Sequence, residues 1–267
     1  MSTILETILE TKRREVEALW QRVHRDGPFP ERAEPFRSLA ESLRSAQHLG
    51  VIAEIKRRSP SKGVLQASVD PAARARVYEQ GGALAISVLT DETYFHGALE
   101  DLRAARSAVK LPVLRKDFVI DEIQVDESVS AGADIVLLIA AAMPADRLAA
   151  LSKYARSRGL EVLLEVHGEA EVEAAVAAEP TIIGINNRDL RTFEVDLATS
   201  ERVLRRLPEG CLAIAESGIM GREDALRMAS AGARGILVGE LLMRHADLAS
   251  VQAQVAELCV PLGAVAK

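Results

Sequence analysis

Short apolar runs alternate with longer amphipathic stretches along most of this chain. The apolar runs are rich in Val, Ile, Leu and Ala and predict eight strands, at 51–55, 84–89, 111–114, 135–139, 161–166, 181–185, 211–215 and 235–238. Between them, helical spacing with Ala, Glu and Arg predicts helices at about 70–80, 97–108, 122–131, 144–158, 169–178, 198–206, 221–231 and 246–258. Strand and helix therefore alternate regularly.

Strands that alternate with helices pair in parallel through right-handed crossovers, and this predicts an α/β fold. The runs are apolar almost throughout, as expected for strands that are covered on both faces. A doubly wound open sheet is the rival, but eight regular units without a GxGxxG motif favour a closed sheet. Eight units of about 30 residues need about 240 residues, so we expect residues 1–267 to form a single (β/α)8 TIM barrel.

The segment 1–48 precedes the first predicted strand and is too long to be a linker. Apolar spacing predicts a helix over 2–25, the glycine and two prolines of 26–30 end it, and 36–46 forms a second helix. We interpret 1–48 as an N-terminal helical extension that packs on the barrel, and not as a separate domain.

Charge and cysteine content limit the partners of the chain. The formal net charge is −6, so no overall basic field exists that would hold nucleic acid or an anionic membrane. Cys211 and Cys259 form no CxxC motif, and we expect neither a signal peptide nor a membrane span. These features predict a cytoplasmic protein without disulfides or structural zinc. The sequence does not set the oligomeric state, for which a monomer is our default expectation.

The first predicted strand carries two opposite charges inside an apolar run. Glu54 and Lys56 are two residues apart, so their side chains share one face of a strand. Charges on a buried face are costly unless they are paired or functional, and they indicate a site. The following turn brings hydroxyls from Ser59 and Ser61 and ends at Gly63. Strand and polar turn together predict one wall of an active site.

Polar side chains recur at the carboxyl ends of the predicted strands, where barrel enzymes carry their catalytic groups. Each one alone is more simply a solvated loop charge or half of an ion pair, but recurrence at strand after strand favours function. No histidine has a second metal ligand at usable spacing, and we expect no metal site. These strand-end candidates are Glu54, Lys56, Lys116, Glu165, Asn186, Arg188 and Glu216.

Small residues follow the last two predicted strands, at the positions where barrels often bind phosphate. Glycines there let the backbone approach an anion, although a single glycine would more simply turn the chain into the next helix. With a serine expected on the opposite side, the set favours a phosphoester substrate. The predicted phosphate-binding residues are Ser59, Ser217, Gly218, Gly239 and Glu240.

Together these segments resemble the indole-3-glycerol phosphate synthase family of tryptophan biosynthesis. The matching stretches occur in order from about 50 to 245 and fall at the predicted strand ends. They are IAEIKRRSPSKG, AISVLTDETYFHG, LPVLRKDFVID, ADIVLLIAA, LLEVH, IIGINNRDL, AESGI and LVGELLMR. The helical extension is also similar to that of the family.

The resemblance implies a lyase that closes the ring of 1-(2-carboxyphenylamino)-1-deoxy-D-ribulose 5-phosphate, with loss of carbon dioxide and water and without a cofactor. Lys116 matches the general acid at the ketone oxygen. A nearby Lys56 would lower the pKa of Lys116 and carboxylates would raise it, giving an acid tuned near neutrality. Glu165 matches the second acid or base. Lys56 would hold the substrate carboxylate, with Arg188 adding positive potential.

The remaining implied roles concern orientation and the aromatic ring. Glu54 and Asn186 would orient the sugar hydroxyls and the amine, and Glu216 would add a polar contact. Phe118 and Leu89 are candidate walls for the anthranilate ring, although as apolar residues they could equally belong to the core.

Two other functions stay open. One is another phosphosugar-binding barrel enzyme, such as phosphoribosylanthranilate isomerase, against which the Lys56 and Lys116 pair argues, because proton shuttling at a ribosylamine does not need two lysines. The other is a catalytically silent barrel that binds a phosphorylated metabolite.

Overall fold

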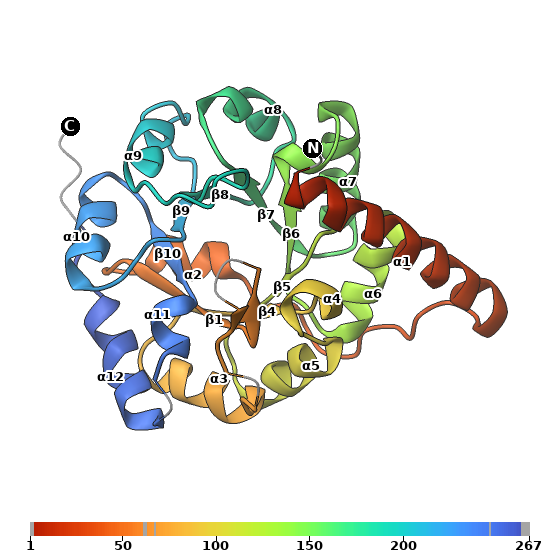
Figure 1. Cartoon of the computed structure of the whole chain (residues 1–267), viewed down its shortest axis with the longest axis horizontal. Helices are drawn as coiled ribbons and strands as arrows, with labels where there is room; N and C mark the ends of the chain where they lie inside the picture. Colours follow the sequence, from red (N-terminus) through yellow and green to blue (C-terminus); the bar gives the residue numbers. More distant parts are fainter. Residues whose placement is uncertain (1–2, 61–62, 67, 246, 263–267) are drawn as a thin grey trace.

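The closed barrel is confirmed, and the open doubly wound sheet is wrong. The computed structural model describes residues 3–60, 63–66, 68–245 and 247–262. Within these ranges eight parallel strands close on one another, each pairing with its neighbours in chain order and β10 pairing with β1 (Figure 1). The strands are β1 (Gly50–Ile55), β4 (Ala85–Leu89), β5 (Val113–Lys116), β6 (Ile135–Ile139), β7 (Glu161–Val166), β8 (Ile182–Asn186), β9 (Ala213–Glu216) and β10 (Gly235–Val238).

A helix follows each of these strands, and the helices surround the barrel (Figure 1). None of the described helices is long and apolar enough to span a membrane. The helices after the strands are α3 (Pro71–Gln80), α5 (Leu99–Ala108), α6 (Glu122–Ala131), α7 (Ala145–Ser157), α8 (Val172–Ala177), α9 (Ala198–Leu204), α10 (Arg222–Ser230) and α12 (Leu248–Leu258).

Several short elements were not predicted, because they are too short to show a period in the sequence. All of them lie in loops that follow barrel strands. The predicted serine at position 61 lies outside the described residues. The short elements are α4 (Glu92–Phe95), α11 (Glu240–Met243), the one-turn helices at Ala140–Ala142 and Glu169–Glu171, and the antiparallel hairpin of β2 (Arg58–Ser59) and β3 (Gly63–Val64).

The strands separate two apolar layers. In β1, Val51 and Ala53 face the surrounding helices, whereas Ile52 points into the barrel and packs in a cluster with Leu114 and Ile135. Because strand side chains alternate between the two faces, the residue after Ala53 points inward again. Glu54 therefore reaches the inner face at the carboxyl end of β1, where a substrate can enter.

The N-terminal extension covers both ends of the barrel. At the amino-terminal end of the strands, α2 (Leu39–Ser45) inserts Leu39 and Leu43 into the interior cluster, and the carboxylate of Glu161 accepts a hydrogen bond from the Leu39 N–H at 3.0 Å. At the opposite end, α1 (Ile4–Asp26) crosses in front of β6 and runs along α6 (Figure 1). Its first turns form part of the wall of the site described next.

Candidate active site

A cavity of about 490 Å³ opens at the carboxyl ends of the strands. It lies where barrel enzymes hold their substrates. The structure brings together in its lining all of the candidate residues predicted from the sequence: Glu54, Lys56, Ser59, Leu89, Lys116, Phe118, Glu165, Asn186, Arg188, Glu216, Ser217, Gly218, Gly239 and Glu240.

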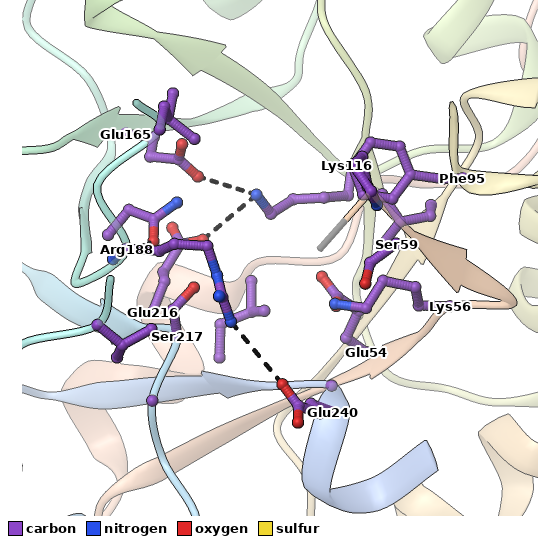
Figure 2. Close-up of a pocket in the computed structure, with 18 of the residues that line it drawn as sticks. Glu54, Lys56, Ser59, Phe95, Lys116, Glu165, Arg188, Glu216, Ser217 and Glu240 are labelled. Atoms are coloured by element: carbon purple, nitrogen blue, oxygen red, sulfur yellow. Dashed lines mark hydrogen bonds and ion pairs between the residues drawn. The ribbon is translucent and has the colours of Figure 1, made fainter. Parts of the chain in front are cut away.

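Lys116 is the centre of the charged part of this cavity. It is the last residue of β5, which ends at 116 and not at 114 as predicted. Its Nζ lies 2.9 Å from Oε2 of Glu165 on β7 and 3.3 Å from Oε2 of Glu216 on β9 (Figure 2). Both carboxylates are buried, and strands β5, β7 and β9 thus supply one cation and two acids at the same level of the barrel.

The expected near-neutral acid is not Lys116. Burial alone would lower the pKa of Lys116, but the surrounding carboxylates, Glu165 foremost, outweigh burial and raise this pKa above its ordinary value. The same contact with Lys116 holds the pKa of Glu165 well below its ordinary value, in spite of burial. Burial, with repulsion from Glu165, raises the pKa of Glu216 to about 8 against the attraction of Lys116.

The group that titrates near neutrality is therefore Glu216. Glu165 and Glu216 lie beside the same ammonium, but their pKa values differ widely. At neutral pH Glu165 is therefore ionised and Glu216 carries a proton. The sequence had suggested only a polar contact for Glu216. The site thus holds a cation, a base and a neutral acid within one cluster.

Glu54 and Lys56 face each other, as their spacing predicted. Lys56 Nζ lies 2.5 Å from Oε1 of Glu54, although Lys56 follows the end of β1 and is not part of it. Ser59, in the short hairpin after β1, is buried beside them, across the cavity from Ser217 (Figure 2). The first strand end therefore contributes a closed ion pair and a hydroxyl.

Arg188 reaches across the mouth of the cavity (Figure 2). One guanidinium nitrogen, Nη2, lies 3.8 Å from Oε2 of Glu240, and the other, Nη1, donates a hydrogen bond to the carbonyl of Phe193 at 3.1 Å. Its backbone N–H donates to Oδ1 of Asn186 at 3.0 Å. Arg188 therefore links the end of β8 to the start of α11.

The loop after β9 has an unusual backbone. Ser217 and Gly218 both adopt positive φ, at 64° and 85°, a conformation that glycine tolerates and serine adopts at a cost. Asn187 fixes this loop, because its Nδ2 donates to the carbonyls of Glu216 at 3.0 Å and Ser217 at 3.1 Å. Sequence reasoning missed Asn187, which points to the helix side of β8 while Asn186 points into the cavity. The alternation of strand faces was the signal that could have separated the two.

One side of the cavity is apolar. Phe118 and Leu89 line it as expected, and Phe95 of α4 joins them, with its ring centroid 6.1 Å from that of Phe118. From the extension, Ile4 and Ile8 of α1 complete this wall. The sequence did not indicate Phe95, Ile4 or Ile8 as site residues, because none of them directly follows a barrel strand.

A buried ion cluster joins α1 to this wall. Lys12 is 2% exposed, and its Nζ lies 2.8 Å from Oδ2 of Asp91 and 2.9 Å from Oδ1 of Asp117. Burial opposes the charge of Lys12, but both carboxylates outweigh burial and raise its pKa. Asp117 is the residue after Lys116, so the cluster also anchors the end of β5. Lys12 was missed because a lone lysine on a helix looks like a surface residue.

In the part of the chain that the structure describes, no group of three or more His, Cys, Asp or Glu side chains is placed to hold a metal ion. What the cavity offers instead is a set of acids, amines and amides from the ends of several strands. The fold and this site define a (β/α)8-barrel enzyme that acts on a small substrate at the carboxyl ends of its strands.

Comparison with known proteins identifies the family. The family model described as indole-3-glycerol phosphate synthase matches residues 5–257. The indole-3-glycerol phosphate synthase of Bacillus cereus is 47% identical over 249 residues, which cover 93% of this chain and 96% of that protein. The enzyme of the same name from Oceanobacillus iheyensis is 47% identical, with 92% of this chain and 94% of that protein covered. The chain belongs to the indole-3-glycerol phosphate synthase family.

Solved structures with the same fold are more distant in sequence. A thiamine phosphate pyrophosphorylase from Pyrococcus furiosus superposes with a TM-score of 0.59 at 16% identity, covering 80% of this chain and 96% of that one. An N-acetylmannosamine-6-phosphate 2-epimerase from Clostridium perfringens gives 0.61 at 15% identity, covering 79% and 93%. At these identities the similarity concerns the fold alone.

Proposed function

We propose that the cavity at the strand ends carries out the reaction of the family on 1-(2-carboxyphenylamino)-1-deoxy-D-ribulose 5-phosphate. A bond forms between the aromatic ring and the ketone carbon, and carbon dioxide and water are lost to give indole-3-glycerol phosphate. The observation that carries the proposal is the ammonium of Lys116 held between Glu165 and Glu216 at the centre of the cavity.

In ring closure, negative charge develops on the ketone oxygen as the aromatic carbon attacks. Lys116 is the cation available to stabilise that charge and to donate a proton to the oxygen. Its raised pKa keeps it protonated at neutral pH, and Glu165 and Glu216 keep its ammonium at one place. Loss of the substrate carboxylate as carbon dioxide then restores a neutral ring precursor.

Dehydration needs an acid for the leaving hydroxyl and a base for the remaining proton. Glu216 carries a proton at neutral pH and can donate it to the hydroxyl, so that water leaves. Glu165 is ionised and can accept the proton that is lost as the indole forms. Lys116 contacts both carboxyl groups and so keeps them close to the carbon atoms of the substrate that lose the hydroxyl and the proton.

The other residues bind and orient the substrate. Lys56 exchanges its contact with Glu54 for the substrate carboxylate, which frees Glu54, together with Asn186, to bind sugar hydroxyls and the amine. Arg188 adds positive potential, and the apolar wall of Phe118, Phe95 and Leu89 receives the anthranilate ring. The phosphate binds at the mouth, to Ser59, Ser217, Gly218, Gly239 and the backbone N–H of Glu240.

The direct test is to mix the protein with the carboxyphenylamino substrate and record the appearance of indole fluorescence. We expect turnover without added metal or cofactor. Isomerase activity on phosphoribosylanthranilate in place of indole formation would favour the rival enzyme. Phosphate binding with no turnover of either substrate would favour the silent barrel.

We also propose that residues 1–267 act as one monomeric domain in the cytoplasm, which fits the two free cysteines of the described chain. Size-exclusion chromatography with light scattering tests the monomer, for which a mass of about 29 kDa is expected from the 28.8 kDa of the chain.

A further inference from the structure

His167 lies beside Glu165 but is not part of the lining of the cavity. It follows the last residue of β7, and its Nε2 lies 3.2 Å from Oε1 of Glu165. The other oxygen of the same carboxylate, Oε2, lies 2.9 Å from Nζ of Lys116. Each oxygen of Glu165 therefore faces a different basic side chain, one in the lining of the cavity and one outside that lining.

Glu171 fixes the imidazole from the far side. One of its oxygens, Oε2, accepts a hydrogen bond from the backbone N–H of His167 at 2.7 Å and lies 3.7 Å from the ring atom Nδ1. Among the described residues, the ion pairs of the ring are with Glu165 and Glu171 alone, and Lys116 and Glu216 lie beyond Glu165. The imidazole thus stands between two carboxylates.

The contact with Glu165 depends on charge more than on hydrogen-bond alignment. Both ring nitrogens are buried, and neither makes a well-aligned hydrogen bond with a described residue. Burial opposes the charge of His167, but Glu165 and Glu171 outweigh burial and raise its pKa to about 10. At neutral pH the imidazole is a cation, and its attraction to Glu165 acts in a poorly solvated place.

We propose that His167 is a positioning residue of the reaction, which holds the carboxylate of Glu165 ionised and turned so that its other oxygen faces Lys116 and the substrate. The proposal rests on the role of Glu165 as the base given above. Without this second cation, Glu165 and Glu216 would share the single positive charge of Lys116. The proton of Glu216 could then move to Glu165, and the base would be lost.

The test compares His167→Gln with the wild type across pH. Glutamine keeps a donor of similar reach but carries no charge, so we expect kcat to fall roughly tenfold while KM changes by less than about twofold. The acid limb of the kcat profile should move upward by about one pH unit, because the cation that favours ionised Glu165 is gone. His24→Gln, at an exposed site on α1, is the matched control and should keep the wild-type profile.

Glu171→Gln supplies a second variant that leaves the imidazole in place. Loss of this carboxylate lowers the pKa of His167 towards that of Glu216, so we expect the alkaline decline of kcat, which Glu216 sets near pH 8 in the wild type, to become steeper. This variant carries the test if His167→Gln does not fold. Unchanged profiles in the folded variants, or a loss of thermal stability with the pH midpoint unmoved, would overturn the proposal.

A readout without turnover separates this proposal from the proposed function. The carbon-13 resonance of the Glu165 carboxyl reports its ionisation directly, and its midpoint should move upward in His167→Gln even if the wild type were inactive on the proposed substrate. An inactive wild type with that shift would refute the proposed function alone. An active wild type without the shift in His167→Gln would refute the role of His167 alone.

Discussion

Gly239 leaves free the space that the carboxylate of Glu54 occupies. A Cβ atom at position 239 would overlap Oε1 of Glu54, the same oxygen that holds Nζ of Lys56 at 2.5 Å. The sequence had suggested glycine here for close approach of the backbone to phosphate. The contact with Glu54 is a second reason for glycine at position 239, because a side chain there would displace the ion pair of Glu54 and Lys56.

Gly239→Ala should therefore reduce activity more than stability. The φ of Gly239 is −120° and does not lie in the positive range that disfavours alanine, so we expect a fall in the melting temperature of only a few degrees. Displacement of Glu54 and Lys56 should lower kcat/KM by about tenfold or more. Steady-state kinetics and thermal unfolding check both values. Gly221→Ala, where an added Cβ meets nothing within 4 Å, is the control, and equal effects in the two variants would contradict the argument.

Glu216 should make the stability of the protein depend on pH in an identifiable direction. Its pKa of about 8 in the folded chain lies above the ordinary 4.5, so the folded state keeps a proton that the unfolded state releases. The contribution of Glu216 to the free energy of unfolding is therefore complete below about pH 4.5 and is lost as the pH rises through about 8.

Urea unfolding between about pH 5 and 9 measures this contribution. We expect the free energy of unfolding of the wild type to fall over this window more steeply than that of Glu216→Gln, because glutamine has no proton to lose. Parallel curves for the two proteins would show that Glu216 is already ionised at pH 5. The kcat of Glu216→Gln should also lose the ionisation near pH 8.

The barrel and the set of strand ends could be predicted because burial leaves a simple pattern. Strands covered on both faces read as continuous apolar runs, and at several carboxyl ends the inward residue is a polar one, as at Glu165 and Asn186. The pattern gives no information about side chains that come from outside the barrel strands. Lys12 and Phe95 lie on helices that do not directly follow a strand end, and they contact residues that are distant in the sequence.

The protonation states could not be predicted for a different reason. The sequence indicated which charges meet, but the pKa of Lys116 depends on the balance between burial and three carboxylates, and that balance requires distances. The expectation that Lys116 is an acid near neutrality was wrong. The pKa of Glu216 lies near neutrality because Glu216 is buried near Glu165 and Glu54, and the attraction of Lys116 does not outweigh these effects.

Lys116→Met should abolish the chemistry while leaving phosphate binding nearly intact. The variant removes the only proposed donor to the ketone oxygen and takes away the ammonium that lies 3.3 Å from Oε2 of Glu216, so we expect kcat to fall by roughly 10²–10⁴-fold. Steady-state turnover and competition by inorganic phosphate measure the two effects. The exposed Lys110→Met is the matched control. Turnover within about threefold of the wild type would refute the acid assignment.

Lys12→Met tests whether the buried ion cluster holds α1 over the cavity. Methionine matches the length of the lysine stem but leaves Asp91 and Asp117 buried without their shared cation, so we expect the free energy of unfolding to fall by about 3–5 kcal/mol. A loosened α1 also withdraws Ile4 and Ile8 from the apolar wall, and KM should rise by more than kcat falls. Urea unfolding, limited proteolysis of α1 and steady-state kinetics measure these effects against Lys153→Met, an exposed site on α7. If KM and the protease resistance of α1 both stay at wild-type values, the cluster stabilises the barrel without holding the helix over the cavity.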